Sequence, residues 1–234
     1  CLDDRGRNVI SLLSGHLGGA NELARRVAAL TGGRAVITTA TDVHKVEAVD
    51  VWAKEHDCVI ENIGAVKNVS AAALDGEKIG VAVTEAEQPA PWPVTLWLRP
   101  RNLALGVGCK RGTTAEKLET AFAAFCAEHH FAPQGIVRAA SIDLKKDEPG
   151  LAAFCRAHGW EMDFYTAALR TAKGSFTSSG FVQSITGVDN VCERAAVLAA
   201  DGVLFIPKWA RDGVTLAVAL APFAPDWRWK NDEP

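Results

Sequence analysis

Two glycine-rich segments of the sequence carry side chains that can do chemistry beside a small anion. In the first, 14–21 (SGHLGGAN), a histidine stands within a glycine loop, where an imidazole can act as a general base near neutral pH. Glycines let the backbone approach a ligand, and the helix that follows offers unpaired N–H groups. The spacing alone favours a plainer alternative, a tight strand-to-helix turn in which Asn21 caps the helix. The candidate residues are Ser14, Gly15, His16, Gly18, Gly19 and Asn21.

The second segment, 106–114 (GVGCKRGTT), combines two cations, three glycines and two hydroxyls before a predicted helix, a set that suits carboxylate recognition. The first segment lacks the Lys-Ser/Thr pair of a P-loop, and in the second Arg111 stands where a dinucleotide fingerprint has its third glycine. Cys109 is either a nucleophile activated by Lys110 and the helix dipole, or a cysteine that simply packs. The candidate residues are Gly108, Cys109, Lys110, Arg111, Gly112 and Thr113.

Further polar residues follow predicted strands, where ligands of parallel sheets usually bind. Asp143 and Lys145 end one such strand, although a solvated charged loop is the alternative. Glu193 lies alone in an apolar helix, and a buried carboxylate needs a partner, so it is either paired structurally or used chemically. The remaining candidates are Thr38, Thr39 and Asp42, at the end of the second strand, and Ser179, in a serine-rich loop.

The elements that must position these residues alternate between strand and helix. In the first half we predict strands at 8–13, 34–42, 58–62 and 77–85, with helices at 22–30, from 45 to 53, and at 66–74. This alternation indicates a parallel sheet with helical crossovers. The segment 87–101 contains four prolines and is interpreted as a domain connector or an extended edge segment.

The second half repeats the alternation from residue 103 to residue 201, including an amphipathic helix at 115–130 with Leu118, Phe122 and Phe125 on its apolar side. Strands at 203–210 and 214–221 are joined by an Asp-Gly pair, which predicts a hairpin and an antiparallel edge. The expected fold class is α/β, with two α/β/α-type domains whose mostly parallel sheets are joined by the proline-rich connector. The expected domains are 1–98 and 99–222, followed by a loosely held tail, 223–234.

Bulk composition excludes several classes of function. The 25 basic and 28 acidic residues nearly cancel, so we expect no nucleic-acid partner. The six cysteines form no CxxC pair, the histidines form no metal-binding motif, and no apolar stretch is long enough to span a membrane. We therefore expect a soluble cytoplasmic protein without a protein-bound metal. Because the chain starts at Cys1 and runs almost directly into a strand, we also expect that its beginning is missing.

Taken together, these strings resemble the cobalt-precorrin-5A hydrolase (CbiG) family of anaerobic cobalamin biosynthesis. SLLSGHLGGANELA and VITTATD resemble its amino-terminal domain, which in family members is preceded by a further segment, so the first domain looks truncated. A second set of strings resembles the carboxy-terminal domain of the same family: LALGVGCKRGTT, ASIDLKKDEPGL, SSGFV, GVDNVCERAA and VTLAVA. The strings span nearly the whole chain in the family's order.

The resemblance implies hydrolysis of the δ-lactone of cobalt-precorrin-5A, with release of acetaldehyde and formation of cobalt-precorrin-5B. Our hypothesis is that His16 is the base that activates water, with Ser14 and Glu193 as further catalytic candidates, and that backbone N–H groups of a glycine loop hold the oxyanion. Lys110, Arg111 and Lys145 would bind carboxylates of the macrocycle. No separate cofactor is implied, because cobalt arrives with the substrate. Neighbouring methyltransferases of the pathway and a second copy of the chain are the other expected partners.

A second interpretation is not enzymatic. The carboxy-terminal domain also resembles the stand-alone CobE-type proteins of the aerobic pathway, which implies a carrier that binds a corrinoid without catalysis. A third interpretation, a sugar- or nucleotide-binding domain, rests on the glycine loops alone, and the missing phosphate motifs argue against it.

Overall fold

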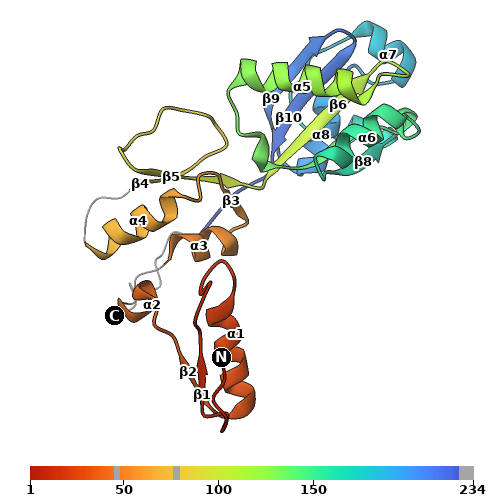
Figure 1. Ribbon diagram of the computed structural model, residues 1–234. Coiled ribbons are helices and arrows are strands. Elements are labelled where there is room, and N and C mark those ends of the chain that lie inside the picture. Colours follow the sequence, from red (N-terminus) through yellow and green to blue (C-terminus); the bar gives the residue numbers. More distant parts are fainter. Residues whose placement is uncertain (45–47, 76–79, 227–234) are drawn as a thin grey trace. The chain divides into compact units, whose positions relative to one another are not determined.

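The computed structural model describes residues 1–44, 48–75 and 80–226, which divide into two compact units (Figure 1). The first unit takes residues 1–84 and 89–99 together with the described end of the chain from residue 225. The second unit takes residues 85–88 and 100–224. Each unit has helices and strands of its own and is described by itself.

The second unit is built on one five-stranded sheet. Its strands are β6 (Leu103–Cys109), β7 (Ile136–Ile142), β8 (Glu161–Tyr165), β9 (Val203–Arg211) and β10 (Val214–Leu220), in the order β8-β7-β6-β10-β9. Strands β6, β7 and β8 run parallel, whereas β10 is antiparallel to both β6 and β9. The α/β class, with mostly parallel strands and an antiparallel edge, is confirmed.

A two-residue turn joins the last two strands. Asp212 and Gly213 both have positive φ, 50° and 81°, as a type I′ hairpin requires. The predicted hairpin is therefore confirmed. Because the turn reverses the chain, it brings the carboxyl end of β9 beside the amino end of β10, at the edge where β6 ends at Cys109.

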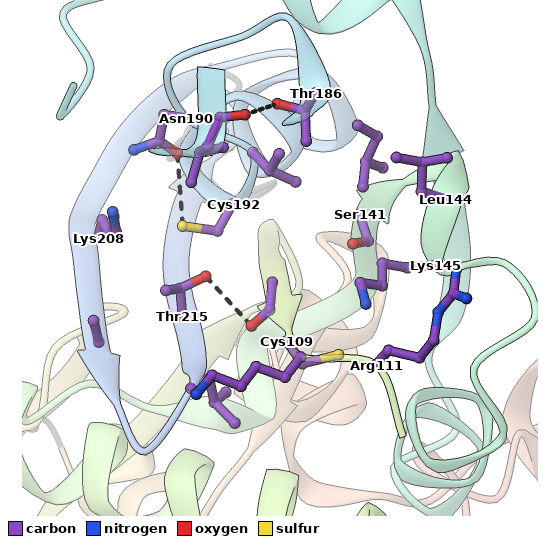
Figure 2. Close-up of a pocket in the computed structure, with 18 of the residues that line it drawn as sticks. Cys109, Arg111, Ser141, Leu144, Lys145, Thr186, Asn190, Cys192, Lys208 and Thr215 are labelled. Atoms are coloured by element: carbon purple, nitrogen blue, oxygen red, sulfur yellow. Dashed lines mark hydrogen bonds between the residues drawn. The ribbon is translucent and has the colours of Figure 1, made fainter. Parts of the chain in front are cut away.

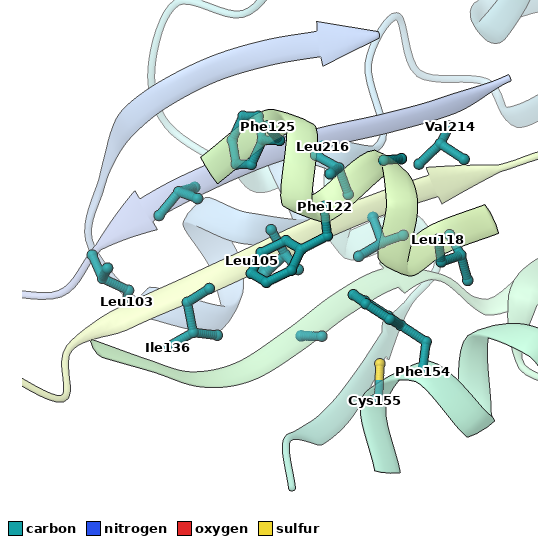
Figure 3. Close-up of a cluster of buried hydrophobic side chains, with 14 of the residues drawn as sticks. Leu103, Leu105, Leu118, Phe122, Phe125, Ile136, Phe154, Cys155, Val214 and Leu216 are labelled. Carbon is teal, nitrogen blue, oxygen red and sulfur yellow. The ribbon is translucent and has the colours of Figure 1, made fainter. Parts of the chain in front are cut away.

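Helices cover both faces of this sheet. On one face α5 (Ala115–His129) and α6 (Pro149–Ala157) enclose the main core, in which Leu105, Phe122 and Phe154 are buried (Figure 3). Leu118, Phe122 and Phe125 of α5 all contribute to that core, as the helical spacing predicts. On the other face α8 (Cys192–Ala200) packs against β6, β7 and β10. The shorter elements are η1 (Pro133–Gly135), η2 (Asp143–Lys145), η3 (Ala167–Thr171) and α7 (Gly180–Thr186).

The contact between α8 and β6 depends on a glycine. A Cβ atom placed on Gly106 would lie 1.8 Å from the backbone carbonyl oxygen of Cys192. We predict that Gly106→Ala destabilises the protein by about 2 kcal/mol or more, because a backbone atom cannot move aside as a side chain can. Gly180→Ala, where the added Cβ meets nothing within 4 Å, is the matched control. Equal urea unfolding midpoints for both variants would refute the prediction.

The first unit holds two small sheets, although the sequence pattern predicts one. Strands β1 (Asn8–Ile10) and β2 (Arg34–Val36) pair in parallel beside α1 (Ala20–Thr31). The predicted strand 34–42 is too long, because the chain turns into the short helix α2 (Ala40–His44). Asp42 therefore lies on that helix, and Thr39 immediately precedes it.

The second sheet of this unit has the order β3-β5-β4, formed by β3 (Cys58–Ile60), β4 (Gly80–Val83) and β5 (Thr95–Pro100). Helices α3 (Val49–Glu55) and α4 (Ala65–Leu74) accompany it. The parts of the predicted helix and strand at 45–47 and 77–79 lie outside the described residues.

The interpretation of 87–101 as a connector or edge segment is wrong for its second half. Strand β5 is central in its sheet, and Leu96 and Leu98 are fully buried. The prolines at 89, 91 and 93 precede the strand, and Pro100 closes it, so none interrupts its pairing. The described part of the predicted tail, 223–226, makes a contact, since the indole of Trp52 donates a hydrogen bond to the carbonyl of Asp226 at 3.2 Å. The rest of that tail, 227–234, lies outside the described residues.

Across the described ranges, no helix combines the length and apolar character needed to cross a membrane.

Candidate functional site

A cavity of about 660 Å³ opens in the second unit where strands β6 and β7 end (Figure 2). Five residues predicted from the sequence line it: Gly108, Cys109, Lys110, Arg111 and Lys145. Its volume lies within the range of small-molecule sites, and its position at the carboxyl ends of parallel strands is the usual place for a ligand. The structure therefore brings Lys110 and Arg111, in the loop after β6, and Lys145, which follows β7, into one site.

A buried carboxylate holds the two parts of this site together. Glu148 accepts hydrogen bonds from the backbone N–H of Gly112 at 2.8 Å and from Nζ of Lys145 at 3.1 Å. The Gly112 N–H, followed by Lys145, lowers the pKa of the Glu148 carboxyl, against the effect of its burial. The loop is closed further by the hydroxyl of Thr113, which donates to the carbonyl of Lys110 at 2.7 Å.

The other candidates of the second unit lie outside the lining of the cavity. Gly112 and Thr113 shape the loop through the bonds just described. Asp143 is exposed in η2, and Ser179 caps α7, its hydroxyl accepting from the N–H of Val182 at 3.5 Å. Direct binding of a ligand by these four residues stays a prediction.

Sequence reasoning missed the far side of the cavity. Lys208 and Arg211 of β9, Thr215 of β10, and Asn190 and Cys192 before and at the start of α8 all line it. The signal that could have found them is the hairpin. When β10 pairs antiparallel with β6, the β9–β10 turn must lie near the end of β6. Lys208 and Arg211, which precede that turn, therefore lie near the end of β6 as well.

The surroundings of Cys109 favour the packing interpretation over the nucleophile. Burial raises the pKa of the Cys109 thiol, although the charge of Lys145 acts in the opposite direction. A thiol with a raised pKa is a poor nucleophile at neutral pH. Its side chain also packs against the main core.

Glu193 is fully buried and accepts four hydrogen bonds. One oxygen accepts from the Thr177 N–H at 2.7 Å and the Asn190 amide at 2.9 Å. The other accepts from the Thr177 hydroxyl at 2.8 Å and the Lys208 N–H at 2.7 Å. These bonds join three segments of the unit, so they supply the structural partners that the sequence argument required for a buried carboxylate. They lend no support to the catalytic candidate role.

The first glycine segment forms a second cluster, in the first unit. Nε2 of His16 lies 2.8 Å from Oδ2 of Asp42, and Nδ1 of His16 lies 3.4 Å from Oδ1 of Asp50. Asp42 also accepts from the hydroxyl of Thr39 and, at 2.7 Å, from the guanidinium of Arg25. The structure thus brings together His16, Thr39 and Asp42 and adds Asp50, which sequence reasoning missed because it lies in a separate helix.

The charge of Asp42 is stabilised in this cluster. Burial alone would raise the pKa of the Asp42 carboxyl, but the Thr39 hydroxyl, His16 and Arg25 together lower it. A low carboxyl pKa keeps Asp42 ionised at neutral pH, so it can accept the Nε2–H of His16 and fix the orientation of the imidazole.

Asn21 does not cap the helix, because Gly19 holds that position. Its side-chain amide instead donates to Oδ2 of Asp42 at 2.8 Å and to the Thr39 hydroxyl at 3.1 Å. Ser14 is exposed and has a positive φ, and a Cβ on Gly18 would lie 2.3 Å from the Ser14 Cβ. Gly15 and Gly19 complete the loop, and Thr38 is exposed.

The two clusters suit different tasks. The first offers a histidine oriented by carboxylates, which is the arrangement of a general base. The second offers cations around a cavity, which is the arrangement of an anion-binding site. Within the described ranges, no group of three or more His, Cys, Asp or Glu residues is arranged to hold a metal ion.

Three family models match the chain: "Cobalamin synthesis G N-terminal" over residues 1–42, "Cobalamin biosynthesis central region" over 47–94 and "Cobalamin synthesis G C-terminus" over 103–219. The cobalt-precorrin-5A hydrolase of Priestia megaterium is 34% identical, over 95% of this chain and 71% of that protein. The protein of the same name from Salmonella typhimurium strain LT2 is 32% identical, over 94% of this chain and 73% of its own.

Protein CobE of a Sinorhizobium species is 32% identical, over 50% of this chain and 79% of its own length. The resemblance seen in the sequence is thus confirmed by models that match in both units and by relatives aligned over most of the chain. This chain belongs to the CbiG family of cobalamin-synthesis proteins, and relatives that align over most of it are named cobalt-precorrin-5A hydrolases.

Proposed function

We propose that this chain is a cobalt-precorrin-5A hydrolase, which opens the δ-lactone of its substrate and releases acetaldehyde to give cobalt-precorrin-5B. One observation carries the proposal: two relatives of that name align with about 95% of the chain, at 34% and 32% identity. His16, Thr39 and Asp42 lie within residues 1–42, which match the amino-terminal family model. Asp50 lies within residues 47–94, which match the model of the central region.

The proposed mechanism uses His16 as the general base. Asp42 holds Nε2 through the shorter contact, 2.8 Å, so Nδ1, whose contact with Asp50 is 3.4 Å, takes the proton of the attacking water. The hydroxide adds to the lactone carbonyl carbon, and the carbon–oxygen bond of the lactone breaks to give a carboxylate and a hydroxyl. Loss of that hydroxyl proton and cleavage of the adjacent carbon–carbon bond release acetaldehyde. The electron pair left on the macrocycle takes up a proton.

This proposal needs no resident cofactor, since cobalt enters as part of the substrate. The chain's own contribution is to hold the macrocycle, orient His16 and move protons at Nδ1. Carboxylate side chains of the substrate are matched by cations at the cavity of the second unit.

A non-catalytic carrier is the second candidate function. It is favoured by one observation, that the cavity lies wholly within the second unit, whose sequence strings resemble the stand-alone CobE-type proteins. The two candidates differ in one product. A hydrolase releases acetaldehyde from cobalt-precorrin-5A under anaerobic conditions, whereas a carrier binds the compound and leaves it unchanged.

A further inference from the structure

The cavity of the second unit has a strongly one-sided charge. Five of its lining residues are cations: Lys110, Arg111, Lys145, Lys208 and Arg211. Asp212 is the one acidic residue among the described residues that line the cavity. Cations gathered around one concave site create a positive potential that draws in a ligand with several negative charges.

Most of these cations have no acidic partner of their own. Lys145 pairs with Glu148 at 3.1 Å, and Arg211 is 3.8 Å from Asp212. For Lys110, Arg111 and Lys208 no carboxylate lies within 4 Å in the part of the chain that the structure describes. Their charges are therefore available to a ligand. A guanidinium such as that of Arg111 can bind a carboxylate of the ligand through two hydrogen bonds.

The cations lie on two sides of the cavity, and Lys110 lies against the hairpin turn, where its backbone N–H donates to the carbonyl of Gly213 at 3.1 Å. Lys208 lies on one side, and Lys145 and Arg111 lie on the other (Figure 2). The backbone of Lys208 is fixed, because its N–H donates to the buried Glu193 at 2.7 Å. A ligand that engages both sides at once must carry carboxylates at separate points of a wide body.

The wall between the cations is apolar. Ile142, Leu144, Val182, Val191 and Val214 line it, and Leu144 is 57% exposed although it is a large hydrophobic residue. Apolar lining with a few placed polar groups is typical of sites that bury the body of an organic ligand. A free inorganic anion would gain nothing from this wall.

From these observations the geometry points to the following assignment, which rests on the proposed function: this cavity is the recognition site for the carboxylate-bearing macrocycle. Lys208 of β9 binds a carboxylate across from Lys145 and Arg111, and Arg211, beside the hairpin turn, binds another. Binding belongs to the second unit and does not require His16. Substrate and product therefore both bind there, because opening the lactone adds a carboxylate and leaves the macrocycle in place.

The test measures binding of uroporphyrin III, a tetrapyrrole with acetate and propionate carboxylates, to the full chain by its absorbance shift. Its fully methylated ester, which lacks the charges, is the comparison ligand. We expect the double variant Lys208→Gln, Arg211→Gln to bind uroporphyrin at least about tenfold more weakly, since two charge-assisted contacts are lost. The matched control, Arg156→Gln with Lys173→Gln, removes two exposed cations outside the cavity lining and should change the affinity less than about twofold.

Unchanged affinity in the hairpin variant, equal affinity for the ester, or no binding by the parent chain would overturn the assignment. A far-ultraviolet circular dichroism spectrum equal to that of the parent shows that the variant is folded. With cobalt-precorrin-5A, the hairpin variant should raise KM with little change in kcat.

Failure of the assignment and failure of the proposed function give different results. Acetaldehyde release by a hairpin variant with parental KM would contradict the assignment of the cavity as recognition site and would support the hydrolase function. If the hairpin substitutions weaken binding and no form of the chain releases acetaldehyde, the assignment of the cavity is supported and the hydrolase function is contradicted.

Discussion

Replacing His16 with alanine is expected to lower kcat for acetaldehyde release by about 100-fold to 10,000-fold, the range for loss of a general base. The KM should change little, because the cations proposed to bind the macrocycle belong to the second unit. Asp42→Asn should lower kcat by a smaller factor. An amide in place of the carboxylate loses the charge that holds the Nε2–H of His16 at 2.8 Å.

Arg25→Gln is the matched control for these variants. Arg25 contacts the same carboxylate at 2.7 Å through Oδ1, whereas His16 contacts Oδ2, and the Arg25 side chain is 52% exposed. Its replacement should change kcat less than about threefold, as an exposed ion pair contributes little. Turnover by His16→Ala equal to that of the parent would remove this residue from the chemistry.

Replacing Glu193 is expected to lower the free energy of unfolding, whereas we expect no direct effect on the chemical step. Glu193→Gln replaces one acceptor oxygen with an amide donor, which then faces either the Thr177 N–H or the Lys208 N–H, each now 2.7 Å from its own carboxylate oxygen. Buried donors left without acceptors cost about 1–3 kcal/mol each. We predict a loss of about 3 kcal/mol or more in the free energy of unfolding, measured by urea denaturation.

Glu161→Gln, at a side chain that is 82% exposed, is the control and should change stability by less than about 0.5 kcal/mol. The catalytic interpretation of Glu193 makes the opposite prediction. Under it, Glu193→Gln would unfold at the urea concentration of the parent and yet lose turnover, and that pair of results would contradict the structural role.

Local patterns predicted most of the second unit because its elements are long and regular. The apolar positions of α5 identify a helix and its buried face, and the continuous apolar run of β6 identifies a buried strand. The Asp-Gly pair identifies the hairpin for the same reason, since its backbone conformation is a local requirement.

The first unit was harder to predict because its strands are short. Three-residue strands such as β1 and β3 show no alternation that distinguishes one sheet from two. Strand β5 was misread because prolines suggested a connector, whereas its burial depends on neighbours that are distant in the sequence.

The candidate sites show the same limit. Glycines, His16 and the cationic loop stand out by residue type, so the sequence could nominate them. Asp50 and Lys208 carry no motif, and they become candidates only because the fold brings them to His16 and to the cavity. Long-range partners of this kind follow from tertiary contacts, which a single sequence does not show.

The most direct test of the account is anaerobic incubation of this chain with cobalt-precorrin-5A, with released acetaldehyde measured enzymatically against time. The His16→Ala variant and a reaction without protein serve as controls. The account predicts acetaldehyde in proportion to the amount of chain added, with cobalt-precorrin-5B formed in equal amount and almost none from the variant. Recovery of unchanged cobalt-precorrin-5A bound to the folded chain, without acetaldehyde, would contradict the hydrolase and favour the carrier.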